Sequence, residues 1–459
     1  MTTHHDAIII GTGQSGPSLA RRLSEAGRNV AIVERKRFGG TCVNNGCIPT
    51  KSLIASAQVA HVARRAGEFG VGIGGPVSVD MKAVKARKDA IVRVSNEGVE
   101  ESLRELANCT VYTGHARFEG QKRLRVGDEA LEADEIFINV GGRASIPSIP
   151  GLQDVPYLTN SSMMEVDFLP EHLVILGGSY IGLEFGQMYR RFGSQVTIVQ
   201  RNTHLIPRED EDTSIAIREI LETEGIRVLT DADATQAECR DGEVLVSVTA
   251  AGETLRVSGS HLLVAVGRRP NTDDLGLEAA GIEVNEQGFI KVDDKLRTGV
   301  PGIWAMGDCN GRGAFTHTSY NDFEIVAANL LDGQARSVDD RIPTYSLFTD
   351  PPLGRAGMTE KEVLRKGIPA RVAKMPMEDV GRAFERSETQ GFMKIIVNAE
   401  TDQILGAALL GIGGDEIVQG LLDLMYAKAP YTVYQRAMHI HPTVFEMIPV
   451  MLEELQPLG

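Results

Sequence analysis

Long apolar runs and positive charge are both scarce in this sequence of 459 residues. A membrane-spanning helix needs about 20 consecutive apolar residues. Neither such a run nor a charged, apolar signal segment after Met1 is present, so we expect a cytoplasmic protein that is neither exported nor inserted into a membrane. Lys and Arg number 47 against 62 Asp and Glu, which gives a net charge of −15. Since binding to nucleic acid needs clustered positive charge, nucleic acid is not an expected partner.

Cysteine is also rare, and five cysteines, an odd number, do not make a structural disulfide framework. Three of them, Cys109, Cys239 and Cys309, stand alone in apolar or loop surroundings and are expected to be inert thiols. Cys42 and Cys47 differ, because they lie five positions apart among glycines. Paired thiols accept or release two electrons by making or breaking one bond. The pair is therefore a redox candidate, and the alternative is two incidental cysteines at the start of a helix.

A complete dinucleotide-binding pattern precedes these two cysteines. The apolar run Asp6–Ile10 predicts a buried strand, and a glycine-rich turn and an amphipathic stretch to about Ala26 follow it. The glycines let a pyrophosphate sit on the amide groups and the positive dipole end of the helix. An acid that closes the second strand can accept both hydroxyls of an adenosine ribose. The candidate cofactor-binding residues are Gly11, Gly13, Gly16 and Glu34, together with Gly40 and Thr41 beside the cysteines.

The same pattern recurs after a second apolar run, His172–Leu176, with Gly177, Ser179 and Gly182 in its turn. Its acid is replaced by a neutral amide, since Gln200 stands at the position that Glu34 holds in the first unit. Arg201 and Arg208 come shortly after. Two guanidinium groups would hold a 2′-phosphate that a carboxylate would repel, so we expect NADPH here. The alternative is that both arginines only solvate the start of a helix.

The segment Gly39–Lys51 resembles the active site of the pyridine nucleotide-disulfide oxidoreductases, in which a redox disulfide works beside a flavin. The resemblance implies FAD in the first dinucleotide site and a redox-active disulfide between Cys42 and Cys47. It also implies that Cys47 lies against the flavin as a thiolate, whereas Cys42 faces the substrate. Further residues carried over are Tyr180, as a gate over the flavin, and Lys51 and Glu184, as an ion pair near it.

A third block of similar sequence, Thr298–Asp308, is a short apolar strand that ends in a glycine and an acid. In the resembled family such an aspartate contacts the ribityl chain of the flavin. The chain is therefore expected to return to the FAD domain after the NADPH domain, across Pro- and Gly-rich hinges at Ile146–Gly151 and Gly267–Asn271. Gly267 is counted with the cofactor-binding residues.

The expected fold class is α/β, with two Rossmann-like dinucleotide-binding domains, for FAD and NADPH, and an α+β dimerisation domain. The expected boundaries are 1–150 for the first part of the FAD-binding domain, 151–268 for the NAD(P)H-binding domain, 269–341 for the second part of the FAD-binding and central domain, and 342–459 for the dimerisation domain.

The last domain carries a motif that resembles the His-Pro-Thr-x-x-Glu signature of the family, at His441–Glu446. The resemblance implies that His441 is the acid/base, that Glu446 orients it, and that the His441-Pro442 peptide is cis. Because relatives take this histidine from the partner subunit, it also implies a homodimer with composite sites. The alternative is a core histidine bound to a backbone carbonyl. Three methionines, Met438, Met447 and Met451, are spaced as in a packed helix rather than as metal ligands.

The predicted function is an FAD-dependent oxidoreductase that passes electrons from NADPH through FAD and the Cys42–Cys47 disulfide to a disulfide, an oxidant or a soft metal ion. Two stretches, Phe315–Tyr320 and Tyr345–Arg355, are most similar to mercuric-reductase-like and reactive-chlorine-resistance flavoproteins. Against a true mercuric reductase, the sequence ends in Glu453–Gly459 without a cysteine pair. The alternatives are a mercuric reductase, a dihydrolipoamide dehydrogenase-like enzyme, a flavin-only oxidase or transhydrogenase, and a redox sensor.

Overall fold

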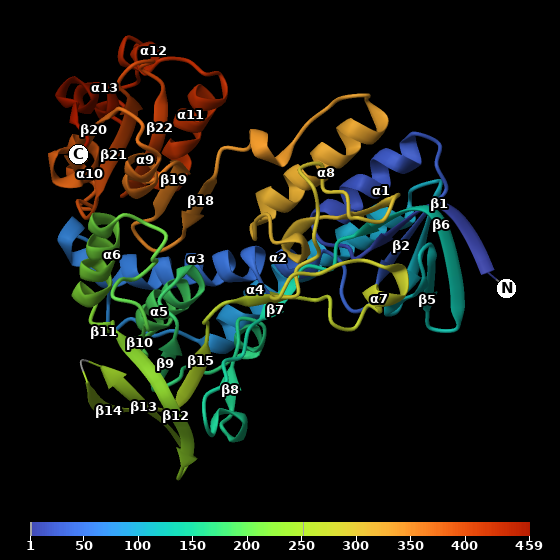
Figure 1. Ribbon diagram of the computed structural model, residues 1–459. Coiled ribbons are helices and arrows are strands. Elements are labelled where there is room, and N and C mark those ends of the chain that lie inside the picture. The colour runs from blue at the N-terminus through green and yellow to red at the C-terminus, as the bar shows by residue number, and fades with distance from the viewer. Residues whose placement is uncertain (1, 251) are drawn as a thin grey trace.

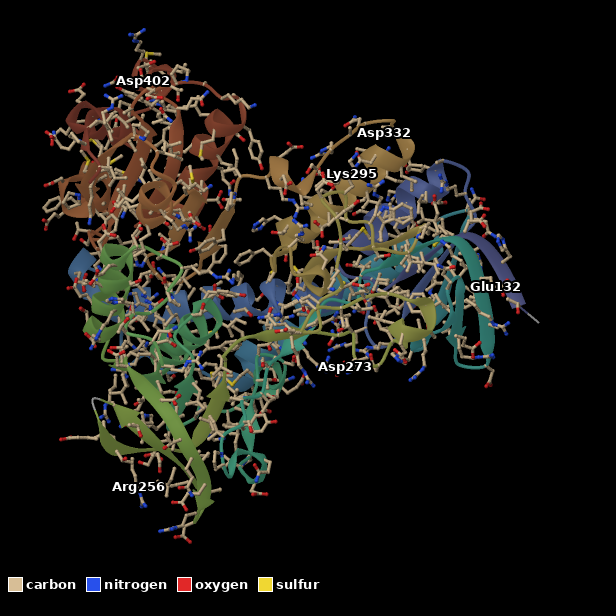
Figure 2. All side chains as sticks on the ribbon, in the orientation of Figure 1. Glu132, Arg256, Asp273, Lys295, Asp332 and Asp402 are labelled. Atoms are coloured by element: carbon tan, nitrogen blue, oxygen red, sulfur yellow. The ribbon has the colours of Figure 1, made fainter. Side chains whose placement is uncertain are left out.

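A computed structural model describes residues 2–250 and 252–459. Two sheets with helices packed on them form the part of the molecule that holds the N-terminus and the middle of the chain (Figure 1). The C-terminal domain, with its own sheet, stands at the upper left of that view, at the other end of the molecule from the N-terminus. Charged side chains cover both ends, as Asp402 and Glu132 illustrate (Figure 2). Within the described residues, no helix is long and apolar enough to cross a membrane.

The first sheet has seven strands in the order β3-β2-β1-β6-β5-β4, with β17 pairing β6. Its centre is parallel, and β4, β5 and β6 form an antiparallel meander. The strand from the third block, β17, joins β6 in parallel and so brings that block into this sheet. The elements of this part are β1 (Thr2–Ile10), α1 (Ser15–Glu25), β2 (Val30–Glu34), α2 (Gly40–Asn44), α3 (Cys47–Arg65), α4 (Met81–Arg104), β3 (Cys109–Thr113), β4 (Ala116–Gly120), β5 (Arg123–Val126), β6 (Glu129–Ile138), β17 (Ile303–Ala305) and α8 (Thr316–Leu331).

Both faces of this sheet are buried, which explains the continuous apolar run at its centre. Ile8 and Ile10 pack into one core cluster, whereas Ala7 and Ile9 pack into the cluster on the opposite face with side chains of α1 and α8. Alternate residues of a strand point to opposite faces, so a strand covered on both sides must be apolar throughout. The C-terminal end of β1 is thereby held rigidly beneath the glycine-rich turn.

The second sheet is wholly parallel, with the order β11-β10-β9-β15-β8, and it repeats the strand-turn-helix unit of the first. A separate three-stranded antiparallel sheet, β12-β13-β14, is inserted between β11 and β15 and lies at the bottom of Figure 1. The elements are β8 (Tyr157–Leu158), β9 (His172–Leu176), α5 (Tyr180–Phe192), β10 (Gln195–Val199), α6 (Glu211–Thr223), β11 (Arg227–Leu229), β12 (Ala232–Arg240), β13 (Glu243–Ala250), β14 (Glu253–Gly259) and β15 (His261–Val264). The short helix α7 (Leu277–Ala280) packs on β4 of the first sheet.

The two crossings between these sheets are paired with each other by a short ladder. Arg268–Pro270 forms a strand, β16, which pairs antiparallel with β7 (Gly142–Ala144). The segment after Gly267 is therefore held in a ladder, in which each crossing satisfies backbone groups of the other. The paired crossings fix the second sheet beside the first.

The third sheet is antiparallel, with the order β18-β19-β22-β21-β20-β23. Helix α11 packs on β19 and β22, and short helices close the domain. The elements are β18 (Thr344–Leu347), β19 (Leu353–Gly357), α9 (Glu360–Lys366), β20 (Ala370–Pro376), α10 (Gly381–Glu385), β21 (Phe392–Asn398), β22 (Ile404–Leu410), α11 (Gly414–Tyr426), α12 (Thr432–Gln435), α13 (Met447–Met451) and β23 (Gln456–Pro457).

One apolar cluster joins the three parts of the molecule. It contains Leu53 of α3, Leu183 of α5 and Leu353 of β19, all buried. Helix α3, which begins at Cys47, therefore packs against both the second unit and the last domain. Burial of a side chain such as Leu contributes about 1.5–3 kcal/mol, so this shared core holds the three parts around the start of α3.

Candidate active site

A cavity of about 860 Å³ lies where these parts meet, and it collects most of the first-site residues. Its walls come from the glycine-rich turn, the two cysteines, helix α5 and strand β18. The predicted residues that line it are Gly11, Gly13, Glu34, Gly40, Thr41, Cys42, Cys47, Lys51, Tyr180, Glu184 and Asp308. The remaining predicted residues, Gly16, Gly177, Ser179, Gly182, Arg201, Arg208, Gly267, His441 and Glu446, are not among its lining residues.

The turn at the first site can accept only glycine at two of its positions. Gly11 has φ +104°, and a Cβ there would lie 2.3 Å from the carbonyl oxygen of Asn139. At Gly16 a Cβ would lie 2.3 Å from the carbonyl oxygen of Gly11. The Asn139 side chain donates hydrogen bonds to the carbonyls of Gly11 and Gly13, at 3.3 and 3.1 Å. The result is an open cradle of backbone at the start of α1, which fits the pyrophosphate of FAD.

Glu34 and Gln200 occupy equivalent places in the two units. Glu34 accepts hydrogen bonds from the backbone N–H and the hydroxyl of Thr12, at 3.1 and 2.6 Å. Gln200 accepts one from the backbone N–H of Gly178 at 3.1 Å. Both side chains therefore brace the turn after the first strand. Glu34 also lines the cavity, and a carboxylate can accept further bonds, so it remains available to a ribose.

The two thiols lie side by side, with Cys42 in α2 and Cys47 as the first residue of α3. The hydrogen bond between them lowers the pKa of Cys47 to about 6, and Thr316 and Lys51 act in the same direction against the effect of burial. That hydrogen bond, together with burial, raises the pKa of Cys42. Cys47 Sγ is 3.1 Å from the hydroxyl of Thr316. A thiol at a helix N-terminus is stabilised as a thiolate, so Cys47 is the member of the pair that ionises first.

The ion pair expected beside the cysteines is present. Lys51 Nζ lies 2.6 Å from Glu184 Oε2, and the same ammonium group lies 4.4 Å from the centre of the Phe348 ring. Glu184 is nearly buried, and its other oxygen accepts a hydrogen bond from the backbone N–H of Phe348 at 3.1 Å. The pair therefore joins α3, α5 and the segment after β18 along one wall of the cavity.

Aromatic rings form another wall. Tyr180 lies at the start of α5, 5.6 Å from the centre of the Phe315 ring. Burial raises the pKa of the Tyr180 hydroxyl, which keeps it neutral. Burial likewise raises the pKa of Asp308, although Arg268 lies 3.5 Å from it and opposes this effect. The Tyr180 ring, at the start of α5, and the Asp308 carboxyl group, just after β17, thus both line the cavity.

The second dinucleotide site has the same strand-turn-helix geometry but lies outside the cavity. A Cβ at Gly182 would lie 2.0 Å from the carbonyl oxygen of Gly177, so this turn is as tight as the first. Ser179 stands just before α5. The side chains of Arg201 and Arg208 are exposed, and within the described ranges neither forms a hydrogen bond or an ion pair. Both guanidinium groups are therefore available to a ligand.

His441 and Glu446 form a pair away from the cavity of their own chain. Nδ1 of His441 lies 3.0 Å from Glu446 Oε1, and the His441-Pro442 peptide is cis. The imidazole side chain is 83% exposed. The Glu446 carboxylate holds the ring by its Nδ1 side. The motif thus presents an exposed histidine paired with Glu446 rather than a core histidine.

Three expectations about other sulfur residues need correction or completion. Met438 is 99% exposed and lies outside α13, so it does not share a packed helix with Met447 and Met451. Cys239 is exposed on strand β12, in neither an apolar nor a loop setting. Burial raises the pKa of Cys309 to about 12 and that of Cys109 to about 11, which agrees with inert thiols.

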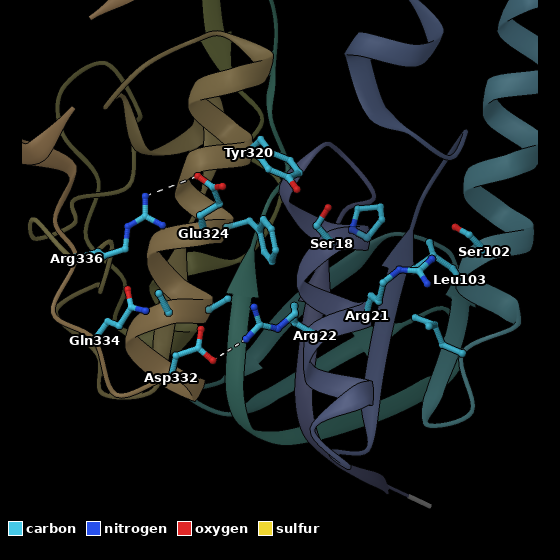
Figure 3. Close-up of a pocket in the computed structure, with 15 residues that line it drawn as sticks. Ser18, Arg21, Arg22, Ser102, Leu103, Tyr320, Glu324, Asp332, Gln334 and Arg336 are labelled. Atoms are coloured by element: carbon cyan, nitrogen blue, oxygen red, sulfur yellow. Dashed lines mark hydrogen bonds and ion pairs between the residues drawn. The ribbon is translucent and has the colours of Figure 1, made fainter. Parts of the chain in front are cut away.

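A second cavity, of about 660 Å³, opens between α1 and α8 (Figure 3). Two of its arginines are paired with acids: Arg22 of α1 with Asp332 at 2.7 Å, across the opening, and Arg336 with Glu324 at 3.8 Å, on the α8 side. None of the predicted catalytic or cofactor-binding residues lines it.

Several residues of the first cavity were not identified as site residues from the sequence. Thr316 contacts Cys47, Asn139 holds the glycine turn, and Tyr345 and His317 line the aromatic wall. Thr316 lies 269 positions from Cys47, so no local pattern could connect them. The only available signal was that Phe315–Tyr320 and Tyr345–Arg355 are stretches of family-like sequence.

Comparison with known proteins agrees with this geometry. Residues 5–322 match the family model described as pyridine nucleotide-disulphide oxidoreductase, and residues 343–452 match the dimerisation domain of the same family. A probable pyridine nucleotide-disulfide oxidoreductase of Escherichia coli (strain K12), RclA, is 36% identical over 97% of this chain and 98% of its own. A mercuric reductase of Streptomyces lividans is 36% identical over 97% of this chain and 95% of its own.

Solved structures show the same fold. The HOCl-induced flavoprotein disulfide reductase RclA from Escherichia coli superimposes with a TM-score of 0.90 at 35% identity, covering 98% of this chain and 99% of the other. The α/β fold, the use of FAD and NAD(P)H and the oxidoreductase activity predicted above are therefore those of this protein, and its dimerisation domain makes it a homodimer. The chain belongs to the pyridine nucleotide-disulphide oxidoreductase family.

Proposed function

We propose that this protein uses NADPH to reduce a small thiophilic acceptor at Cys42, and that cupric ion is such an acceptor. The observation that carries the proposal is the unequal ionisation of the two thiols. The pKa of Cys47 is lowered to about 6, whereas the pKa of Cys42 is raised. At neutral pH one thiol is thus a thiolate while the other keeps its proton until a base removes it. Such a division suits an inner thiolate and an outer, acceptor-facing thiol.

FAD, when bound, would supply the two-electron chemistry that links the reduced nicotinamide to the disulfide. The residues of this chain hold and tune it: the first-site glycines and Glu34 for the dinucleotide, Asp308 for its ribityl chain, and Tyr180 as the gate. Lys51, fixed by Glu184, places a positive charge near Cys47 and lowers its pKa. A fixed charge of this kind stabilises negative charge that develops during reduction.

Cys42 needs a base, because its pKa is raised. In the proposed mechanism the partner subunit's His441 supplies that base through Nε2, and Glu446 holds the ring by Nδ1. Exposed apolar residues next to this histidine, Met438 and Ile440, suit a surface that a partner covers. Each active site of the homodimer is then composite.

Two relatives favour a metal ion as the acceptor. One solved structure is a Cu(II) complex of RclA from Escherichia coli, and a relative of 36% identity is a mercuric reductase. The electrons balance when two thiols become one disulfide: they release two electrons and two protons, and two cupric ions each take one electron. Thiolates bind cuprous ion well, so the reduced product is stabilised as it forms. A dihydrolipoyl dehydrogenase of Thermus scotoductus is 33% identical, so lipoamide stays the second candidate.

The acceptor is tested by mixing the purified homodimer with NADPH and, separately, cupric ion, mercuric ion, glutathione disulfide, lipoamide or a hypochlorite-derived oxidant. We expect consumption of NADPH and formation of cuprous ion in a ratio of one to two. Cys42→Ser should abolish both, whereas Cys239→Ser, at an exposed thiol remote from the cavity, should leave both unchanged. Oxidation of NADPH that survives alkylation of the reduced dithiol would instead show a flavin-only oxidase, and the lack of turnover with every acceptor would indicate a redox sensor.

The preference for NADPH rests on the free guanidinium groups of Arg201 and Arg208. Arg201→Ala should weaken NADPH binding by roughly ten- to a hundredfold, since a charged hydrogen bond contributes about 1.5–3 kcal/mol, and it should hardly affect NADH. Arg256→Ala is the matched control, because this arginine is exposed on β14 of the inserted sheet (Figure 2). Equal losses for both cofactors would contradict a phosphate-binding role. The proposed location is the cytoplasm, where the dithiol is kept reduced.

A further inference from the structure

Residues 201–210, here called the arginine loop, are tied to the cavity by a buried pair of side chains. Glu209 lies at the end of this loop, and its side chain is only 1% exposed. The Tyr345 hydroxyl donates a hydrogen bond to Glu209 Oε1, and Arg355 Nε lies 3.8 Å from the same oxygen. Tyr345 itself is one of the cavity walls. Glu209, next to the second dinucleotide site, thus contacts Tyr345, which lines the cavity of the first site.

The ring of Tyr345 continues into the aromatic wall. It lies parallel to Phe315, with ring centres 5.5 Å apart and an interplanar angle of 4°. Phe315 stacks in turn on His317, at 5.3 Å and 8°, and contacts Tyr180 at 5.6 Å. An unbroken series of contacts therefore runs from Glu209 to the ring that gates the flavin.

The buried carboxylate makes this connection stiff. Among the residues that the structure describes, Glu209 Oε2 and Arg355 Nη2 have no hydrogen-bond partner. The hydrogen bond from the Tyr345 hydroxyl therefore offsets much of the cost of burying the Glu209 carboxylate. Removal of this hydroxyl would leave a buried carboxylate oxygen without a hydrogen bond. A displacement of Glu209 must either draw Tyr345 with it or break this bond.

The residue after Glu209, Asp210, is anchored. A bound ligand can therefore move the arginine loop only on the N-terminal side of Glu209, where Arg201 and Arg208 lie. Asp210 accepts hydrogen bonds from the backbone N–H groups of Glu360 and Lys361, at 3.1 and 3.3 Å. It also pairs with the buried ammonium group of Lys394 at 3.2 Å. Asp210 therefore acts as a fixed end, and a ligand on the exposed guanidinium groups would act on Glu209 from the other side.

We propose that Glu209 and Tyr345 are positioning residues that couple the arginine loop to the aromatic wall, so that a cofactor bearing a 2′-phosphate reorders the rings around Tyr180. This coupling rests on the proposed binding of NADPH at Arg201 and Arg208. The 2′-phosphate then has two effects. It increases the affinity for NADPH, and it orders the rings between which the nicotinamide reaches the flavin.

The first test needs no turnover. Adenosine 2′,5′-bisphosphate, with adenosine 5′-monophosphate as its control, is added to the FAD-loaded homodimer, and hydrogen exchange of Thr344–Leu347 and Gly313–Thr318 is measured. The bisphosphate alone should slow exchange in the wild type. Tyr345→Phe and Glu209→Gln should lose this response while binding the bisphosphate within about twofold of wild type. Lys374→Gln is the matched control, since Lys374 pairs with Asp212, just beyond the loop, at a 43% exposed position without contacting Tyr345.

The second test measures flavin reduction at saturating NADPH and NADH. In the wild type, the limiting rate constant of flavin reduction should be higher with NADPH than with NADH. Tyr345→Phe should lower the rate constant with NADPH roughly tenfold and leave that with NADH unchanged, so that the two rate constants become similar. Equal limiting rates in the wild type, or an unchanged ratio in Tyr345→Phe, would overturn the coupling. Because Tyr345→Phe removes only a hydroxyl, it carries the test if Glu209→Gln fails to fold. Unchanged NADPH affinity in Arg201→Ala would instead reject the phosphate site itself.

Discussion

The chemistry of this protein begins with two thiols that the fold makes unequal. The six-residue stretch Cys42–Cys47 crosses from one helix to the next, so Cys47 stands at the N-terminus of α3 and Cys42 does not. The hydrogen bond between the thiols, the Thr316 hydroxyl and the ammonium group of Lys51 all favour the thiolate of Cys47. No single one of these contacts is unusual, and their convergence on one sulfur separates the two roles.

This separation predicts a pH-dependent absorbance band. In the two-electron-reduced enzyme the thiolate of Cys47 beside FAD should give a long-wavelength charge-transfer band. Because its pKa is lowered to about 6, the band should be complete at neutral pH and should disappear as the pH falls through about 6. In the oxidised enzyme, Cys42→Ser should show the band because Cys47 is then free, and Cys47→Ser should abolish it. A band that persists without Cys47 would reverse the assignment of the two thiols.

At the scale of an element, the glycines of the first turn meet two different requirements: some are needed for packing, and others leave space for the cofactor. Gly16 is needed by the protein itself, since a Cβ there would collide with the carbonyl of Gly11 at 2.3 Å. Gly13 lines the cavity, and the atom nearest to a Cβ there would be Nδ2 of Asn139, at an ordinary contact distance of 3.4 Å. The first is a packing requirement, and the second concerns the cofactor.

Alanine substitutions should distinguish the two. Gly13→Ala should leave the thermal stability of the FAD-free protein nearly unchanged and weaken FAD binding, because the methyl group occupies space that the pyrophosphate needs. Gly16→Ala should lower the stability even without FAD, since strand and helix must move apart. Calorimetric melting and FAD titration of the apoprotein measure both effects. An equal loss of stability in the two variants would show that Gly13 is also a packing residue.

For the whole molecule, a buried ion cluster holds the second unit against the last domain. Lys394 of β21 is 1% exposed and contacts Asp210, Asp212 and Glu360, at 3.2, 2.9 and 2.9 Å. The acids come from two different parts of the chain, so the cluster fixes the arginine loop relative to the third sheet. Removing the lysine would leave three carboxylates around an apolar side chain.

Lys394→Met should therefore destabilise the protein by about 3–5 kcal/mol, the usual cost of breaking a buried ion pair from one side. Lys374→Met removes a partly exposed lysine that pairs with Asp212 and lies over the Phe392 ring, and it should cost about 1 kcal/mol or less. Urea denaturation followed by circular dichroism compares the two variants. Similar losses in both would mean that the cluster is too hydrated to act as a buried network.

The dimer provides a further test at this scale. A subunit that lacks His441 and a subunit that lacks Cys42 should both be inactive alone, and activity should return when they are co-assembled, since each mixed dimer contains one intact composite site. Activity should approach half that of the wild type per mixed dimer. Mixtures that stay inactive despite proven subunit exchange would place His441 in the site of its own chain.

The structural setting could be predicted for residues that lie in a local motif or that the family resemblance carried over. The turn after Ile10, the ion pair of Lys51 with Glu184 and the cis peptide before Pro442 are present as expected. The pairing of Arg268–Pro270 with Gly142–Ala144 was not predicted, because the two strands lie more than a hundred positions apart. Met438 was wrong as a helix residue, since spacing alone does not show where a helix begins. The domain boundaries and the catalytic roles stay predictions.

Local patterns were sufficient for the cofactor motifs and the dithiol, because a tight turn, a helix start and a short thiol spacing depend on neighbouring residues. Contacts between distant segments required the folded chain. Thr316 reaches Cys47 from 269 positions away, and Tyr345 reaches Glu209 from 136 positions away. These contacts arise because three sheets pack around the start of α3, and side chains from all three then share one cavity. The motifs thus predicted the type of chemistry. The packing of distant segments determined the acidity of each thiol and the contact of Tyr345 with Glu209 between the two cofactor sites.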